Sequence, residues 1–334
     1  MSVSERFLVA GYGSIGKRHL GNLRQMFPQA DIAVLRSGVA GSDSVVPPGA
    51  DHVFYDFEAV RAFAPQAAIV ATPATYHVEL TRRLLALGCH VLLEKPIAAA
   101  SEAVPEMIAE ARRSGRVLMI GYNLVFTPAM AAFRDAVRSG MVGRPLCIRA
   151  EVGQYLPDWR PGSDYRRGAS ARRDLGGGVL LELSHELHYL EWIFGRVDWV
   201  QATVQRSGTL ELEVEDLALL NLGFAEGAVA SVQLDFLQRT YSRFCKVVGS
   251  AGTLLWDASQ QSVLFFPPNE KQGREVFREA SADRNGAYLR ELEHFFNCVR
   301  NGTRPMVDAD DGWAVLRVIE AARTSASEGK RIVL

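Results

Sequence analysis

A short apolar run near the start of the chain ends in three spaced glycines. Residues 7–10 (FLVA) are followed by residues 11–16 (GYGSIG) and then by a stretch that can form a helix. The first glycine permits a tight turn, the second lets a phosphate approach the backbone, and the third lets the helix pack on the strand. Free N–H groups at a helix start favour negative charge. The order strand, turn, helix therefore predicts a dinucleotide-binding turn, made by Gly11, Gly13, Ser14, Ile15 and Gly16.

Strands and helices alternate after this turn. Apolar runs at residues 32–35, 67–71, 90–93 and 117–120 read as strands buried on both faces. Residues 76–87 and 101–114 have helical periodicity. This alternation predicts an α/β fold with a doubly wound parallel sheet, over residues 1–123.

Polar residues follow the ends of these predicted strands. Ligands of such sheets bind beyond the carboxyl ends of the strands. We therefore expect the site to be formed at Gly11, Arg36, Thr72, Glu94, Lys95, Pro96, Tyr122 and Asn123.

The residue after the second predicted strand indicates which cofactor binds. An acidic residue about twenty positions after the glycines usually binds the ribose hydroxyl of NAD. Here Arg36 and Ser37 occupy that position, and a guanidinium can pair with the 2′-phosphate of NADP. The sequence predicts NADP, with NAD as the alternative. The competing interpretation is that Arg36 is simply a solvated arginine at the end of a strand.

The second half predicts a different kind of sheet. Strands are expected at residues 146–154, 199–205, 217–224, 228–236 and 244–249, with stronger alternation of apolar and polar residues. Such alternation is typical of a largely antiparallel sheet with one covered face. Helices are expected at about 286–300 and 310–327. We assign residues 124–334 to a substrate-binding and oligomerisation domain.

Three further motifs give the chain a family resemblance. They are A-T-P-x-x-x-H at residues 71–77, E-K-P at 94–96 and G-Y-N at 121–123. Together with the glycine turn, they resemble the Gfo/Idh/MocA family of NAD(P)-dependent oxidoreductases, which mostly act on sugars and cyclitols. The resemblance implies a Rossmann domain, and a C-terminal open sheet that joins subunits into a homodimer or homotetramer. It also implies cofactor contacts from Thr72, Pro73, His77, Glu94, Lys95, Asn123, Trp159 and Arg160.

Lys95 is the leading candidate for acid–base catalysis. Hydride transfer to or from a carbinol carbon requires a group that exchanges a proton with the hydroxyl. A partly desolvated lysine beside a positive nicotinamide should lose its proton more readily than in water. We expect His185 to share or relay that proton, oriented by Glu182, and Glu94 to contact the cofactor ribose.

The register of the second catalytic pair is open. The family pattern is an aspartate, three residues, then a histidine. Counting from the glycines at 176–178 places Glu182 and Glu186 at these positions, whereas a one-residue deletion places Glu182 and His185 there. We favour Glu182 and His185, which share a face if the helix is continuous. His188 stands where many members have aspartate; no metal site is predicted.

Five arginines lie between residues 160 and 173. One interpretation is a solvated loop. The other is an anion-binding rim for a phosphorylated or nucleotide-linked sugar, because guanidinium groups match phosphate. We assign substrate contacts to Lys95, Tyr122, Arg160, Arg166 and His185, and the subgroup that the chain resembles is associated with amino-sugar and surface-polysaccharide pathways.

Composition excludes several classes. The 334 residues have a formal net charge of −1, which gives no field for nucleic acid or a membrane surface. Four scattered cysteines suit a reducing cytoplasm, and no apolar run is long enough for a membrane span or precedes the glycine turn as a signal peptide. Two rival functions are a cofactor-binding sensor or co-repressor, and an epimerase or glycosidase with tightly held cofactor.

Overall fold

The computed structural model describes residues 5–38, 45–270, 272–279, 283 and 285–334. The chain forms two compact units, of which the first contains residues 1–122 and 288–313 and the second contains residues 123–287 and 314–334. The first boundary lies one residue from the predicted one. The sequence-based division assigned residues 288–313 to the second domain, whereas in the structure they pack with the first unit.

The first unit contains a six-stranded, wholly parallel sheet in the order β3-β2-β1-β4-β5-β6. Each predicted strand is present, and the doubly wound fold is confirmed. The short third strand was missed because only three residues pair. The strands are β1 (Arg6–Ala10), β2 (Asp31–Leu35), β3 (His52–Phe54), β4 (Ala67–Val70), β5 (His90–Glu94) and β6 (Leu118–Gly121).

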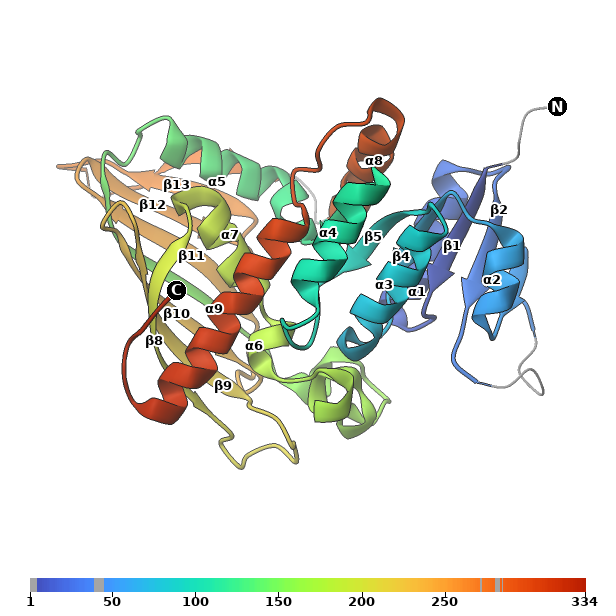
Figure 1. Cartoon of the computed structure of the whole chain (residues 1–334). Helices are drawn as coiled ribbons and strands as arrows, with labels where there is room; N and C mark the ends of the chain where they lie inside the picture. Colours follow the sequence, from blue (N-terminus) through green and yellow to red (C-terminus); the bar gives the residue numbers. More distant parts are fainter. Residues whose placement is uncertain (1–4, 39–44, 271, 280–282, 284) are drawn as a thin grey trace. The chain divides into compact units, whose positions relative to one another are not determined.

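Helices connect these strands and bury one face each (Figure 1). In α4, the buried positions Val104, Met107, Ile108 and Ala111 repeat with helical spacing, and Gly115 ends the helix with φ +63°. In α2, the Asp56 side chain accepts a hydrogen bond from the Ala59 N–H at 2.8 Å. The helices are α1 (Ser14–Met26), α2 (Phe57–Phe63), α3 (His77–Ala86) and α4 (Val104–Ser114).

An aromatic cluster explains why a late segment returns to the first unit. Phe296 on α8 (Gly286–Asn301) packs against Phe7 of β1 at 5.0 Å and against Phe27 at 4.6 Å between ring centroids. The Ile120 N–H also donates to the Val307 carbonyl at 3.1 Å. Burying these rings together stabilises the association of α8 with the parallel sheet.

The second unit contains a nine-stranded sheet in the order β14-β13-β12-β11-β7-β10-β9-β8-β15. Its described pairs are antiparallel except for β7 with β10. The prediction of a largely antiparallel sheet is confirmed, but strands β12 to β15 were not predicted. The strands are β7 (Pro145–Gly153), β8 (Val197–Gln205), β9 (Leu217–Phe224), β10 (Val229–Asp235), β11 (Ser242–Gly249), β12 (Gly252–Asp257), β13 (Ser262–Phe266), β14 (Arg274–Arg278) and β15 (Ile332–Val333).

Side chains alternate across the central strands of this sheet. On β10, Ala230, Val232 and Leu234 are buried and lie on the face covered by helices, whereas Val229 and Ser231 are exposed. Helices α5 (Pro128–Arg138) and α7 (His185–Phe194) pack on strands of the sheet (Figure 1). Short α6 (Val179–Glu182) precedes α7, and α9 (Ala309–Glu328) follows α8. Among the described residues, no helix is both long and apolar enough to cross a membrane.

Candidate active site

The glycine turn has the geometry that a pyrophosphate requires. Gly11 has φ +98°, and a Cβ there would lie 2.4 Å from the Ala71 carbonyl oxygen. A Cβ on Gly16 would lie 2.1 Å from the Gly11 oxygen, so the helix starts directly on the turn. Gly13 is exposed with nothing within 4 Å of its Cβ position. The first turn of α1 has no acidic residue, and Gly13 makes no side-chain cap. Ser14 and Ile15 begin this helix, and the residues fit a dinucleotide.

Two basic side chains flank Tyr12 beside this turn. The Arg36 guanidinium lies 5.4 Å from the Tyr12 ring centroid, and the Lys17 ammonium lies 5.1 Å from it. Arg36 directly follows β2, where its N–H donates to the Phe54 carbonyl at 2.9 Å. Ser37 is exposed beside it. The end of β2 therefore has positive charge where an NAD-binding chain usually has a carboxylate.

The His77 ring links the segments that follow strands β4 and β5. Its Nε2 lies 2.8 Å from the Thr72 carbonyl oxygen, and its Nδ1 lies 2.8 Å from the Pro96 carbonyl oxygen. Burial lowers the pKa of His77, although both carbonyls favour the protonated ring. The ring is 1% exposed, so the expected cofactor contact from His77 is not supported. It braces Thr72, half-buried with Pro73 at the end of β4, against the turn that contains Lys95.

The Glu94 carboxylate is directed into the protein. Its Oε1 lies 2.7 Å from Nε2 of His19 on α1, and its Oε2 accepts from the Lys95 N–H at 3.3 Å. Glu94 is 7% exposed, whereas Lys95 is half-buried. Both Glu94 oxygens are thus engaged, and the predicted contact with the cofactor ribose is not supported. Lys95 is the member of this turn that can reach a ligand.

Tyr122 does not match its predicted role. Its side chain is completely buried, so a direct substrate contact is not supported. Asn123, the next residue, is half-buried at the start of a 3-10 turn over Asn123–Phe126. The sequence placed both at the end of a strand, but strand-end position alone does not indicate which side chain faces out.

In the second unit, Glu182 and His185 lie on two helices. Glu182 ends α6 and His185 begins α7, with Leu183 and Ser184 between them. The continuous helix that the sequence predicted was therefore wrong. Both side chains are half-buried. The glycines before them are structural rather than a flexible segment, because a Cβ on Gly178 (φ +114°) would lie 2.5 Å from the Glu215 carboxylate.

Glu186, the alternative catalytic position, is fully buried in an ion pair. Its two oxygens accept from Nε and Nη2 of Arg243 at 2.7 and 3.0 Å. A bidentate pair of this kind holds α7 on β11. Burial lowers the pKa of His188 to about 3, which keeps its ring neutral. The geometry favours His185 over Glu186 as the residue that exchanges protons.

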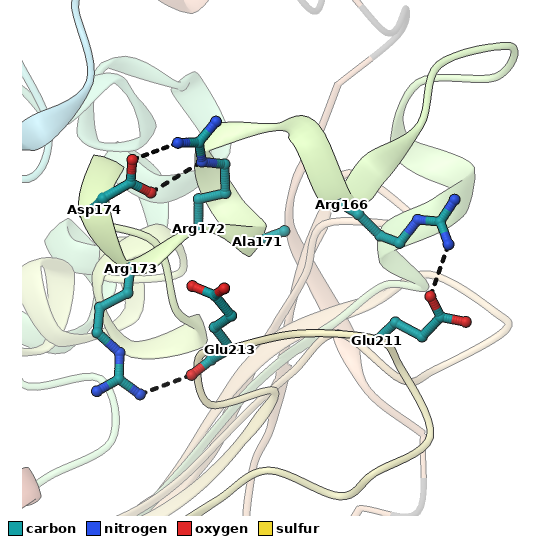
Figure 2. A pocket seen from close by; sticks show the side chains of 7 residues that line it. All are labelled: Arg166, Ala171, Arg172, Arg173, Asp174, Glu211 and Glu213. Atoms are coloured by element: carbon teal, nitrogen blue, oxygen red, sulfur yellow. Dashed lines mark hydrogen bonds and ion pairs between the residues drawn. The ribbon is translucent and has the colours of Figure 1, made fainter.

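The arginine segment lines a hollow of about 620 Å³ within the second unit (Figure 2). Arg166 pairs with Asp164 at 2.8 Å and with Glu211 at 2.7 Å, and Arg172 pairs with Asp174. Three basic and three acidic side chains line the hollow, so their formal charges balance. They are Arg166, Arg172, Arg173, Asp174, Glu211 and Glu213. Of the three acids that line the hollow, Glu211 and Glu213 come from a distant part of the sequence, which the sequence analysis did not consider.

Trp159 is anchored in the same unit. Its Nε1–H donates to the Gln154 carbonyl at 3.2 Å, and its ring meets Phe236 edge-on at 5.4 Å. Arg160 is exposed beside it. Trp159 is therefore held by its own loop, and Arg160 is the member of the pair that solvent can reach.

Comparison of the sequence with protein-family models agrees with the two folds described above. Residues 5–122 match the oxidoreductase family, NAD-binding Rossmann fold, of the Gfo/Idh/MocA group, and residues 134–334 match its C-terminal alpha/beta domain. The chain belongs to the Gfo/Idh/MocA oxidoreductase family. The resemblance inferred from the motifs is confirmed, and the chain is an enzyme of the oxidoreductase class.

Relatives and solved structures match over most of the chain. It is 28% identical to 1,5-anhydro-D-fructose reductase of Ensifer adhaerens, over 77% of this chain and 78% of that one. It is 26% identical to myo-inositol 2-dehydrogenase of Thermotoga maritima, over 98% of each. A levoglucosan dehydrogenase in complex with NADH has the same fold, with a TM-score of 0.85, 19% identity and 99% coverage of both chains. The WlbA dehydrogenase of Bordetella pertussis, in complex with NADH and UDP-GlcNAcA, has a TM-score of 0.81, with 22% identity and coverage of 100% and 98%.

The sequence analysis missed one polar cluster. His19 on α1, Glu94 on β5 and Glu291 on α8 are all buried in the first unit, and one nitrogen or oxygen from each lies within 4.8 Å of the other two. Glu291 occupies the buried stripe of α8 with Ala287 and Phe295, at helical spacing. A charged residue on that apolar stripe was the signal that could have revealed it.

Proposed function

We propose that this oxidoreductase transfers a hydride between C4 of a nicotinamide cofactor and a carbinol carbon of a sugar or cyclitol. The observation that carries the proposal is one sheet edge with both required parts, the open glycine turn at Gly13 and the half-buried Lys95. The reductase and dehydrogenase names of the relatives support the substrate class.

Each catalytic residue has a distinct part in this proposal. The bound cofactor supplies or accepts the hydride. Lys95 takes a proton from the substrate hydroxyl during oxidation and returns it to the carbonyl oxygen during reduction. His185 relays that proton and Glu182 orients its ring. Asn123, Thr72 and Pro73 are proposed to contact the cofactor.

We propose that NADP(H) is preferred over NAD(H). Arg36, Lys17 and Ser37 would surround a 2′-phosphate at the end of β2, and the cationic groups near Tyr12 support this. A guanidinium paired with a phosphate makes charge-assisted hydrogen bonds, which are stronger than neutral ones.

A phosphorylated or nucleotide-linked sugar is the second candidate substrate. The observation that favours it is the hollow lined by three arginines, with Arg160 exposed nearby in sequence (Figure 2). Against it, Arg166 and Arg172 are already paired with carboxylates. An incoming phosphate would have to replace those partners, so a neutral sugar is the preferred candidate.

We also propose a homo-oligomer, a dimer or tetramer, that forms through the open sheet face. Val229, Cys147 and Val248 are exposed neighbours in one register row across β10, β7 and β11. Contiguous exposed apolar side chains of this kind are typical of interaction surfaces. The four cysteines are free thiols, which supports a reducing, cytoplasmic location.

A turnover screen tests the proposed activity. Purified protein is mixed with NADP+ or NAD+ and a panel of sugars, cyclitols, sugar phosphates and nucleotide sugars, while the absorbance of the reduced nicotinamide is followed. We expect continuous reduction with at least one sugar. Cofactor binding without turnover of any substrate would instead support the sensor or co-repressor. A cofactor that stays bound to the protein and shows no net reduction would support the epimerase or glycosidase.

A further inference from the structure

Three buried polar side chains from distant parts of the sequence meet beside Lys95. His19 and Glu291 are 0% exposed and Glu94 is 7% exposed. Glu94 Oε1 lies 2.7 Å from His19 Nε2, and one oxygen of Glu291 lies within 4.8 Å of both partner atoms. The trio belongs entirely to the first unit.

Glu291 is the unusual member of this trio. In the part of the chain that the structure describes, neither of its carboxylate oxygens has a hydrogen-bond partner. An ionised carboxylate buried without partners is strongly unfavourable. Burial, together with the negative charge of Glu94, raises the pKa of Glu291 well above its usual value. A proton on Glu291 removes its negative charge, and with it the cost of burying that charge and the repulsion from Glu94.

A metal ion would be the other way to neutralise two carboxylates and an imidazole. Two ligands around a tetrahedral zinc ion lie about 3.4 Å apart, because each bond is about 2.0–2.1 Å long. His19 and Glu94 are 2.7 Å apart, which is a hydrogen-bond distance. The geometry therefore favours a hydrogen bond between His19 and Glu94 over a metal ion held by both.

The trio is connected to the catalytic turn through Glu94. Its second oxygen, Oε2, accepts from the Lys95 N–H at 3.3 Å. On the opposite side, β6 approaches so closely that a Cβ on Gly121 would lie 3.2 Å from the Glu94 Cδ and Oε2. A Glu94 carboxylate fixed in this way fixes the backbone from which the Lys95 side chain extends.

We propose that Glu291 is a neutral carboxylic acid in the folded protein, and that its lack of charge lets Glu94 stay paired with His19, which makes Glu291 a positioning residue for Lys95. When Glu291 loses its proton, Glu94 is repelled and the Lys95 turn shifts. The catalytic part of this inference rests on the proposed role of Lys95, but the protonation of Glu291 does not.

In the described part of the chain, the groups that the structure places beside Glu291 are His19 on α1 and Glu94 at the end of β5. The ring of Tyr288, from the preceding turn of α8, lies edge-on to His19 at 5.8 Å. Of these, the negative charge of Glu94 acts on Glu291 most directly. The pH dependence below is therefore assigned to the trio.

The decisive comparison is between wild type, Glu291→Gln and the control Glu293→Gln, an exposed position on the same helix. A group that is protonated in the folded state with a raised pKa stabilises the fold below its unfolded pKa, and that stability is lost as pH rises through the folded pKa. We expect wild type and Glu293→Gln to lose thermal stability together as pH rises from about 5. Glu291→Gln, which has no proton to lose, should lack this part of the pH slope.

An infrared difference spectrum of wild type minus Glu291→Gln should show the C=O stretch of a protonated carboxylic acid at neutral pH.

Kinetics then test the positioning role. Glu291→Gln should keep kcat and extend activity to higher pH than wild type. Glu291→Ala should lower kcat about tenfold or more with little change in KM, because a displaced catalytic group is costly. Identical pH slopes for wild type and Glu291→Gln, with no carboxylic acid band, would overturn the neutral state of Glu291. A rise in wild-type thermal stability with Zn²⁺ or Mn²⁺, lost in Glu291→Gln, would replace it with a metal site.

Two outcomes separate this inference from the proposed function. If the band and slopes appear but Lys95→Ala retains turnover, Glu291 holds its proton and the role of Lys95 is wrong. If Lys95→Ala abolishes turnover while Glu291→Ala keeps wild-type kcat, the positioning role of Glu291 is wrong.

Discussion

At the scale of single residues, Arg36 determines the charge at the end of β2. We predict that Arg36→Ala weakens NADPH binding about tenfold, since a hydrogen bond to a charged group contributes about 1.5–3 kcal/mol. NADH binding should change little. Fluorescence titration with both reduced cofactors measures this, with Arg61→Ala, an exposed arginine on α2, as the control. Equal losses for NADPH and NADH would contradict it.

A second residue-scale prediction settles the register of the catalytic pair. His185→Ala should lower kcat by about 10²-fold, the usual contribution of a group that transfers a proton. Glu186→Gln should instead lower stability by about 3–5 kcal/mol, because it leaves the Arg243 charge buried without its partner. Folded Glu186→Gln should keep most of its kcat at low temperature.

The register prediction is measured by denaturant unfolding and by initial rates on the same samples. Glu191→Gln, five residues further along α7, is the control for the loss of an ion pair whose arginine, Arg196, is more exposed than Arg243. A silent His185→Ala, together with a folded but inactive Glu186→Gln, would show that the glycine-anchored register is right.

At the scale of elements, the arginine segment shows how sequence charge can mislead. We predict that Arg166→Ala with Arg167→Ala leaves the ratio of kcat/KM for a sugar phosphate and its neutral counterpart unchanged. The reason is that Arg166 is held by Asp164 and by Glu211, the pair that Figure 2 shows. Ion pairs between exposed groups contribute little to stability because water screens them, so stability should fall only slightly. A lost preference for the phosphate, with strong salt dependence in wild type, would restore the anion-binding rim.

Most elements could be predicted because their signals are local. The apolar runs of β1, β4 and β5 are continuous, and α4 repeats its buried positions at helical spacing. The break at Leu183 and Ser184 could not be predicted, because the surrounding residues have helical periodicity. Neither could the partners of Arg166 and Glu94, since Glu211 and His19 are distant in sequence and meet them only after folding.

At the scale of the whole molecule, the open sheet face has a testable consequence. We predict that Val229→Lys with Val248→Lys shifts the protein toward monomer, because charge is placed on the apolar row that would be buried between subunits. Size-exclusion chromatography with light scattering measures the mass. Ser231→Lys, exposed on the same strand face, is the milder control. An unchanged oligomer in the double variant would assign the interface elsewhere.

The unit that residues 288–313 join could not be predicted from the sequence. Residues 288–313 come after strands β7 to β14 of the second sheet in sequence, yet Phe296 packs with Phe7 and Phe27 in the first unit. Helical periodicity predicted α8 itself. It did not indicate which sheet the helix would cover, because an apolar stripe fits any apolar surface.

The central claim is hydride transfer between the nicotinamide and a sugar carbon, with Lys95 as the proton-exchanging group. The most direct measurement uses reduced cofactor with deuterium at both C4 positions and the keto form of the best substrate from the screen. Mass spectrometry then follows the label in wild type and in Lys95→Met, with cofactor affinity measured in both. The account predicts deuterium on the product carbinol carbon with wild type, and no labelled product with Lys95→Met at nearly unchanged cofactor affinity. Product formed without deuterium, or labelled equally by Lys95→Met, would contradict it.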